Sequence, residues 1–333
     1  MTLRQRFSNR AKDAMFLPPA NRYWRSRLYG KVICLLYHRV DLAESNAFLT
    51  WGGSPVISRS DFEAELRFLK GQGAVFLTFA DLLSGSFPTG SDFGVIISFD
   101  DCFLDNYTNG LEVLEAVGIK AVFFQTTGML QADELIWEHL LYWLNRDAKT
   151  AGVFATLAHR VLDAIPGIKE LSGIELVIRL RENVALEQVQ KVLASARQDL
   201  CSQTEVAELA RLAYATPEHV RTAQRLGHEI GSHGHRHFKR ANIDAEVFDW
   251  ELRASAEALT KVLGREPQAF SYPFNSYADG DDTICSRYFA QAATVDADYI
   301  NRDTDPLWIP RFSWPGTEKN SLRQRRWLLT GRI

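Results

Sequence analysis

The sequence predicts an α/β fold in which parallel strands alternate with helices and a largely helical segment interrupts the alternation. Short apolar runs rich in β-branched and aromatic residues, typical of buried strands, recur in both halves of the chain. Amphipathic stretches with helical spacing lie between them. This order indicates parallel pairing through right-handed crossovers, in either a barrel or a doubly wound sheet.

The first third of the chain carries the clearest elements. A serine precedes apolar residues at helical spacing in 60–72, so we expect Ser60 to cap a helix there. A second amphipathic segment, 109–117, precedes Gly118, which favours a helix that ends on a left-handed glycine. Buried strands are expected at residues 31–37, 75–79, 95–99 and 121–125, with a short helix at 80–83.

The pattern changes between about residues 129 and 217, where helical periodicity dominates. We interpret this segment as a largely helical insertion into the α/β core. Its helices are expected at 135–144, 153–162 and 186–200, with one β-rich run at 174–180, and strands resume at 229–230, 269–272 and 292–295.

Basic residues gather at both ends of the chain, although the formal net charge is only −3. Residues 1–31 hold eight Lys or Arg and one acidic residue, and residues 319–332 repeat the bias. Two interpretations stay open: an ordinary solvated surface, or a basic amphipathic face for anionic membrane lipid or a phosphorylated glycan carrier. No nucleic-acid-binding module accompanies the charge, so nucleic acid is not an expected partner.

The N-terminus has no signal-peptide core and no window holds 18 consecutive apolar residues, so we expect neither export nor a membrane-spanning helix. The four cysteines are scattered without metal-type pairing, and three stand in or beside apolar runs. Buried thiols in a reducing compartment fit this usage best. The expected location is cytoplasmic, with association at the inner membrane face if the basic termini bind lipid.

Two carboxylates follow the strand expected at 95–99. Asp100 and Asp101 stand at its carboxyl end, where catalytic groups gather in parallel α/β folds. Adjacent carboxylates there can divide labour, one binding a metal ion and the other taking a proton. For an Asp–Asp pair alone, a turn or a helix cap is the simpler interpretation.

Histidines concentrate in residues 231–237, which hold three of the eight in the chain. His233 and His237 would meet on one face of a helical turn, whereas His235 would point elsewhere. Two histidines and one carboxylate, with open positions for water, have the composition of a hydrolytic metal site. A histidine cluster on the surface is the alternative.

These segments, taken together and in this order, resemble the polysaccharide deacetylase superfamily, carbohydrate esterase family 4. Tyr37 and His38 end the first strand, residues 98–101 read Ser-Phe-Asp-Asp, residues 233–237 read His-x-x-x-His, and residues 272–274 read Tyr-Pro-Phe. The resemblance runs from about residue 31 to residue 311 and covers the helical insertion only loosely.

The resemblance implies a distorted (β/α) barrel over residues 31–333, with the helical insertion at about 129–217, behind a basic extension of residues 1–30. It also implies a divalent metal ion held by Asp101, His233 and His237. Zn²⁺ is the first expectation, with Co²⁺, Ni²⁺ and Mn²⁺ as alternatives. Asp100 would be the general base, taking a proton as water attacks the polarised acetamide carbonyl.

The sequence departs from the family pattern at several positions. Cys102 stands where the family usually has glycine, so it could reshape the loop or add a thiol near the metal. The arginine that often orients the base shortly before the third-motif proline, here Pro273, has no counterpart. No histidine follows His237, so His38 is the best substitute for the general acid, a structural role for it being equally open. Arg311 could also reach the site from the last strand. Substrate contacts are expected from Tyr272, Pro273, Phe274 and Arg311.

The sequence therefore predicts a metal-dependent hydrolase that removes N-acetyl groups from an amino sugar of a cell-surface polysaccharide or its lipid-linked precursor. An N-acetylated glycan is the expected partner. Two alternatives stay open: hydrolysis of a small amide with the same chemistry, and a non-catalytic glycan-binding protein with a degenerate site.

Overall fold

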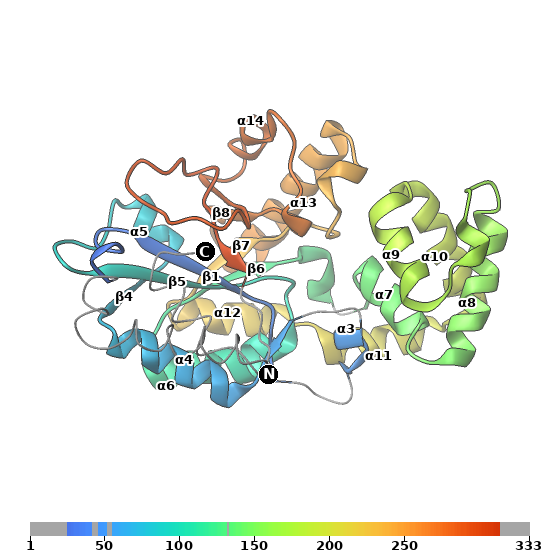
Figure 1. Cartoon of the computed structure of the whole chain (residues 1–333), viewed down its shortest axis with the longest axis horizontal. Helices are drawn as coiled ribbons and strands as arrows, with labels where there is room; N and C mark the ends of the chain where they lie inside the picture. The colour runs from blue at the N-terminus through green and yellow to red at the C-terminus, as the bar shows by residue number, and fades with distance from the viewer. Residues whose placement is uncertain (1–24, 42–45, 52–54, 132, 314–333) are drawn as a thin grey trace, which may run out of the picture.

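The computed structural model describes residues 25–41, 46–51, 55–131 and 133–313 and is built around a curled parallel sheet (Figure 1). Eight strands form this sheet in the order β10-β1-β5-β6-β7-β8-β9, with β4 added to β5. All of these pairings are parallel, as the alternation of strand and helix predicts. The strands are β1 (Val32–Tyr37), β4 (Ala74–Leu77), β5 (Phe93–Phe99), β6 (Val122–Gln125), β7 (Glu229–Ser232), β8 (Ala269–Ser271), β9 (Gln291–Ala293) and β10 (Phe312–Ser313).

The sheet forms the half-barrel of a distorted (β/α) barrel, the predicted fold class. Its centre is the β1–β5 pair, in register from Val32 beside Gly94 to Tyr37 beside Phe99. Every residue of both strands is buried, which explains their continuous apolar sequence. Close packing explains the glycine at position 94, because a Cβ there would lie 2.8 Å from the Val32 side chain.

Helices pack against the sheet, and Figure 1 shows α4, α6 and α12 along one side of it. Helix α4 (Arg59–Gly71) begins after Ser58, whose side chain accepts the Asp61 N–H; the predicted cap Ser60 is therefore wrong by two residues. Helix α6 (Leu111–Val117) ends at Gly118 with a left-handed φ of 72°, as predicted. The other helices of the barrel are α5 (Phe79–Leu83), α12 (Pro217–Arg225), α13 (Ala245–Leu263) and α14 (Asp281–Cys285).

Shorter elements complete the barrel. A two-stranded sheet pairs β2 (Arg39–Val40) with β3 (Val56–Ile57), and α3 (Phe48–Trp51) lies between these strands in the sequence. A π-helical turn, Asn106–Gly110, leads into α6. Short 3₁₀ turns cover Thr127–Gln131, Ile168–Glu170, Arg240–Asn242 and Pro273–Asn275.

The helical insertion stands beside the barrel and has a hydrophobic core of its own (Figure 1). Helices α7 to α11 build this core, whereas α12 packs on the barrel through Val220 and Ala223. The insertion helices are α7 (Trp137–Leu144), α8 (Ala148–Val161), α9 (Gly173–Asn183), α10 (Leu186–Leu200) and α11 (Gln203–Ala213).

The strand predicted at 174–180 is wrong, because α9 occupies these residues. Leu176, Val177 and Leu180 are buried in the insertion core, while Ile174 and Ile178 lie on the exposed side. This spacing is that of one helical face, and packing of that face outweighs the weak β preference of the isoleucines and valine.

The basic termini that could bind lipid lie almost wholly outside the described residues, which exclude 1–24 and 314–333. The basic extension at 1–30 therefore stays a prediction. Within the described part of the chain, no helix is long and apolar enough to cross a membrane.

Candidate metal centre and active site

The predicted chemical groups meet at the carboxyl ends of the parallel strands, around a cavity of about 280 Å³. Loops after β1, β5, β7 and β8 contribute one group of lining residues, the barrel wall, and the insertion helices α7 and α9 contribute another, the insertion wall. The titratable side chains that line the cavity are His38, Asp100, Asp101, Glu138, His139, Tyr142, Arg181, His233, His237 and Tyr272.

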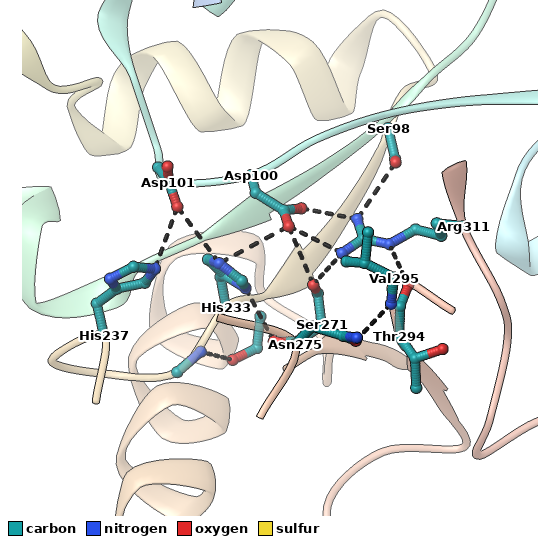
Figure 2. Close-up of polar contacts among 12 residues, drawn as sticks. Ser98, Asp100, Asp101, His233, His237, Ser271, Asn275, Thr294, Val295 and Arg311 are labelled. Carbon is teal, nitrogen blue, oxygen red and sulfur yellow. Dashed lines mark hydrogen bonds and ion pairs between the residues drawn. The ribbon is translucent and has the colours of Figure 1, made fainter. Parts of the chain in front are cut away.

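Asp101, His233 and His237 form a compact donor group at this cavity (Figure 2). Their ligand atoms lie within 4.8 Å of one another and all three side chains are buried. The Nε2 atoms of His233 and His237 lie 3.3 and 3.2 Å from Asp101 Oδ1. Two imidazoles and one carboxylate, converging on one point next to a cavity, fit a divalent ion such as Zn²⁺ with positions open to substrate and water.

The histidines converge without the predicted helical turn. Residues 233–239 form an irregular loop after β7, so the prediction of a helical turn is wrong. Gly234 and His237 have φ values of 77° and 59°, and these left-handed residues turn the loop so that both rings face Asp101. The ring centroids lie 5.0 Å apart. His235 points away, with Nδ1 2.9 Å from Thr127 Oγ1.

A polar contact on the far side of each ring, a hydrogen bond for His233 and an ion-pair contact for His237, directs Nε2 toward the centre. His233 Nδ1 lies 2.8 Å from the Ser271 carbonyl oxygen, which can only accept a hydrogen bond. His233 Nδ1 must therefore carry the proton, which leaves the Nε2 lone pair facing Asp101. His237 Nδ1 lies 3.0 Å from Glu138 Oε1, so a carboxylate from α7 has the same role.

Asp101 and Cys102 both adopt left-handed backbone conformations, with φ values of 71° and 64°. The loop thus keeps a glycine-type conformation at Cys102 without glycine. The thiol points into the barrel core, 4.0 Å from the Ala215 carbonyl oxygen. Burial raises the pKa of Cys102 to about 12, so the thiol stays protonated and does not join the metal donors.

Asp100 is buried beside the metal donors and is paired with Arg311 (Figure 2). Arg311 Nη1 and Nη2 donate to Asp100 Oδ1 and Oδ2, each at 2.8 Å. Burial alone would raise the pKa of Asp100, but the Arg311 guanidinium and the His233 imidazole outweigh it and lower that pKa. The carboxylate is therefore ionised at neutral pH, as a general base must be.

The prediction that Arg311 contacts substrate needs correction. Its side chain is 0% exposed, and its remaining donors bond to Thr294 O, Ser98 Oγ and Ser271 Oγ. A guanidinium with these partners has no access to substrate. Arg311 instead holds both oxygens of Asp100, so it can take the place of the base-orienting arginine that has no counterpart before Pro273.

His38 follows β1 and lines the cavity. The same cavity is lined by Asp100 and Asp101. Nδ1 of His38 is buried and has no hydrogen-bond partner among the described residues. The role of His38 as general acid stays a prediction.

Only part of the Tyr-Pro-Phe segment faces the cavity. Phe274 lies against the metal donors, with its ring 4.7 Å from the His237 ring. Tyr272 reaches the cavity wall, but its ring is buried between Phe248 and Trp308. Pro273 is buried and is not among the cavity-lining residues. Pro273 therefore does not face the cavity, whereas Tyr272, Phe274 and Asn275 line this wall. Substrate contact through Tyr272 and Phe274 stays a prediction.

Sequence reasoning missed the wall that the insertion contributes. Glu138, His139, Tyr142 and Arg181 all line the cavity, and none was expected there. A signal existed, since Glu138 and His139 are polar residues inside the apolar run 135–144. Buried charged residues in such a run are rare unless they are paired.

The fold and this centre define a class of protein: a (β/α)-barrel protein with the side chains of a metallohydrolase site. The polysaccharide deacetylase family model matches residues 186–288, a range that includes His233 and His237. The resemblance drawn from the sequence motifs is thus confirmed.

Solved structures with the same fold cover most of this chain. Streptococcus pyogenes deacetylase PplD in complex with acetate is 16% identical with a TM-score of 0.57, over 89% of this chain and 98% of its own. IcaB from Ammonifex degensii is 17% identical with a TM-score of 0.56, over 90% and 97%. The de-N-acetylase from Aggregatibacter actinomycetemcomitans is 13% identical with a TM-score of 0.55, over 89% and 99%. No curated protein matches the chain.

Proposed function

We propose that this protein is a metal-dependent hydrolase that removes N-acetyl groups from an amino sugar of a cell-surface polysaccharide or its lipid-linked precursor. One observation carries the proposal: the Asp101, His233 and His237 donors lie beside an Arg311-paired Asp100 at one cavity. A donor group and a separate ionised base side by side are what hydrolysis of an amide requires.

Asp101, His233 and His237 would hold the ion, with Zn²⁺ the first candidate and Co²⁺, Ni²⁺ or Mn²⁺ the alternatives. Such an ion, when bound, polarises an acetamide carbonyl and lowers the pKa of water. Burial would raise the pKa of Asp101, but contacts with His233 and His237 hold it well below its usual range. The carboxylate is therefore ready to bind a cation at neutral pH.

Asp100 is the proposed general base. Arg311 holds both of its oxygens, and Ser271 Oγ also lies 3.2 Å from Oδ2. These contacts fix the carboxylate beside His233, 3.7 Å from Nε2, so that it faces the space in front of the donor group. From there it can take the proton of an attacking water.

His38 is the proposed general acid, which protonates the amine as the C–N bond breaks. Its place in the lining of the cavity that Asp100 and Asp101 also line supports this role. After acetate forms, the amino sugar leaves as a free amine.

The structural relatives support the choice of an N-acetyl group. The Aggregatibacter protein is a de-N-acetylase, and the PplD structure contains acetate. We further propose a cytoplasmic location with contact at the inner membrane face, on the strength of the basic termini. Flotation with vesicles that contain anionic lipid tests this proposal, and protein that remains wholly soluble would contradict the membrane contact.

Acetate release from a panel of N-acetylated oligosaccharides, measured on Zn²⁺-loaded protein, tests the function. We expect Asp100→Asn to lower the rate by about 10²–10⁴-fold with metal binding retained. His233→Ala should lose both metal binding and release. His235→Ala is the matched control, because this histidine points away from the centre, and it should keep both.

Two outcomes would favour the alternatives. Tight metal binding without acetate release from any glycan would indicate a glycan-binding protein. Faster hydrolysis of small amides than of oligosaccharides would indicate a small-amide hydrolase, since a polysaccharide enzyme gains rate from contacts with the rest of the chain. Release that survives in both Asp100→Asn and His233→Ala would refute the mechanism.

A further inference from the structure

We propose that the helical insertion is part of the metal centre: Trp137 and Glu138, the first two residues of α7, together hold the ligand His237 in place. The inference rests on the proposed metal-binding role of His237. It assigns these two residues as positioning residues, which act on the centre only through His237.

Two neighbouring side chains of α7 contact His237, one at its imidazole ring and the other at its backbone. Glu138 Oε1 lies 3.0 Å from the ring Nδ1, and both side chains are about 5% exposed. The Trp137 indole Nε1 donates to the His237 carbonyl oxygen at 3.0 Å. Glu138 thus sets the rotation of the ring, while Trp137 holds the backbone from which the ring projects.

His237 needs such support because its own loop does not provide it. Residues 233–239 lie outside regular secondary structure, and His237 has a φ of 59°. A non-glycine residue in this left-handed region costs roughly 1–2 kcal/mol and persists only where its surroundings impose the conformation. Glu251 of α13 (Ala245–Leu263) accepts the N–H groups of His235 and Arg236, and the contacts from α7 act on His237 itself.

Helix α7 is rigid enough to impose that constraint. All of its residues are buried. The hydroxyl of Tyr214 accepts the Ile136 N–H at 3.1 Å and lies 2.6 Å from His139 Nδ1, which ties the start of α7 to the end of α11. The insertion core therefore fixes where Glu138 stands.

The two histidine ligands are supported differently, and this asymmetry sharpens the inference. His233 Nδ1 is held by the Ser271 carbonyl oxygen, a main-chain atom of the barrel strand β8. His237 Nδ1 is held by a side chain of the insertion. A change in the insertion should therefore disturb only one of the two imidazoles.

The expected effect is on metal affinity. A carboxylate beside Nδ1 fixes the tautomer that presents Nε2 to the ion and makes the imidazole a better donor. Removal of such a partner typically weakens metal binding by about 10–100-fold.

The test measures the Zn²⁺ dissociation constant by competition with a chelator and the visible absorption of the Co²⁺-loaded protein. We expect Glu138→Ala to weaken Zn²⁺ binding by about 10–100-fold and to change the Co²⁺ spectrum. Glu138→Gln keeps an acceptor oxygen and should recover part of the affinity. Trp137→Phe removes only the indole donor and should weaken binding less than Glu138→Ala.

Glu134→Gln is the matched control, because Glu134 precedes the same helix and pairs with Arg197. It should bind Zn²⁺ as the unsubstituted protein does. Wild-type affinity together with an unchanged Co²⁺ spectrum in Glu138→Ala would overturn the inference and leave the proposed function standing. If Glu138→Ala does not fold, Glu138→Gln and Trp137→Phe decide by the same readouts. Failure of the unsubstituted protein to bind any divalent ion would overturn both proposals.

Discussion

The two walls of the cavity differ in what they contribute. The barrel wall carries Asp100, Asp101, His233 and His237 on loops at strand ends, with Arg311 buried beneath Asp100. The insertion wall carries Glu138 and other polar residues on helices that have a separate hydrophobic core. The proposed reacting groups therefore belong to the barrel, while support for one proposed ligand, His237, comes from the insertion.

The walls also differ in how their charges are balanced. Asp100 and Arg311 neutralise each other inside the barrel. On the insertion wall, Arg181 is partly exposed and donates to Tyr142 Oη at 3.0 Å, so a cation borders the cavity at the surface. Buried charge on the barrel side keeps Asp100 ionised, whereas the charge of Arg181 on the insertion side is partly open to solvent at the cavity.

The largest effect is expected when the buried pair of Asp100 and Arg311 in the barrel is broken. Arg311→Met leaves Asp100 buried without its cation, so we expect a loss of about 3–5 kcal/mol in unfolding free energy. Acetate release should fall by about 100-fold or more, because the base is no longer held ionised. Chemical denaturation and the acetate assay measure both.

Arg302→Met is the control for Arg311→Met, because Arg302 lies over Phe87 at the exposed surface. It should change stability by less than about 0.5 kcal/mol. The double variant Asp100→Asn with Arg311→Met should lose less stability than the sum of the single variants, since both partners are removed together. Additive losses would show that the two side chains are not coupled.

A second test compares the two hydrophobic cores. Leu141→Ala in α7 and Leu114→Ala in α6 each remove a fully buried leucine, so each should cost about 2–5 kcal/mol of unfolding free energy. Only Leu141→Ala should weaken Zn²⁺ binding, because it loosens the helix that carries Glu138. Equal affinities at equal stability loss would mean that the insertion core does not support the centre.

A third test uses pH. Burial lowers the pKa of His139 to about 3, so this insertion residue stays neutral in the folded protein while the unfolded chain takes up a proton below about pH 6.5. The unfolded state then binds more protons, and stability falls as pH decreases from about 6.5 toward 3. We expect the fall to be steeper in the unsubstituted protein than in His139→Gln by up to about 1.4 kcal/mol per pH unit. Parallel curves from urea denaturation would contradict a buried neutral His139.

The smallest expected effect compares the reactivity of thiols in the barrel with that of a thiol in the insertion. Burial raises the pKa of Cys34, Cys102 and Cys285 in the barrel to about 12 each. Cys201, which follows α10 in the insertion, is partly exposed. A thiol reagent at about pH 8 should label Cys201 first and all four only after unfolding. Fast labelling that persists in Cys201→Ser would show that a barrel thiol is open to solvent.

The strands and the chemical groups at their ends could be predicted from local patterns in the sequence. Continuous apolar runs such as 95–99 encode buried parallel strands, because both faces of such a strand are covered. Asp100 and Asp101 could be placed because the end of a strand is a local feature of the chain. His233 and His237 could be selected as donors because their spacing and residue type are local as well.

Only the tertiary structure decided which partners these groups have. Arg311 stands 211 residues from Asp100 in the sequence, and Glu138 reaches His237 from a helix of the insertion. The loop conformation at His237, and the helix in place of a strand at 174–180, also depend on contacts with distant segments. A local pattern encodes periodicity and residue type, whereas a buried charge is satisfied by whichever distant side chain the fold brings within reach.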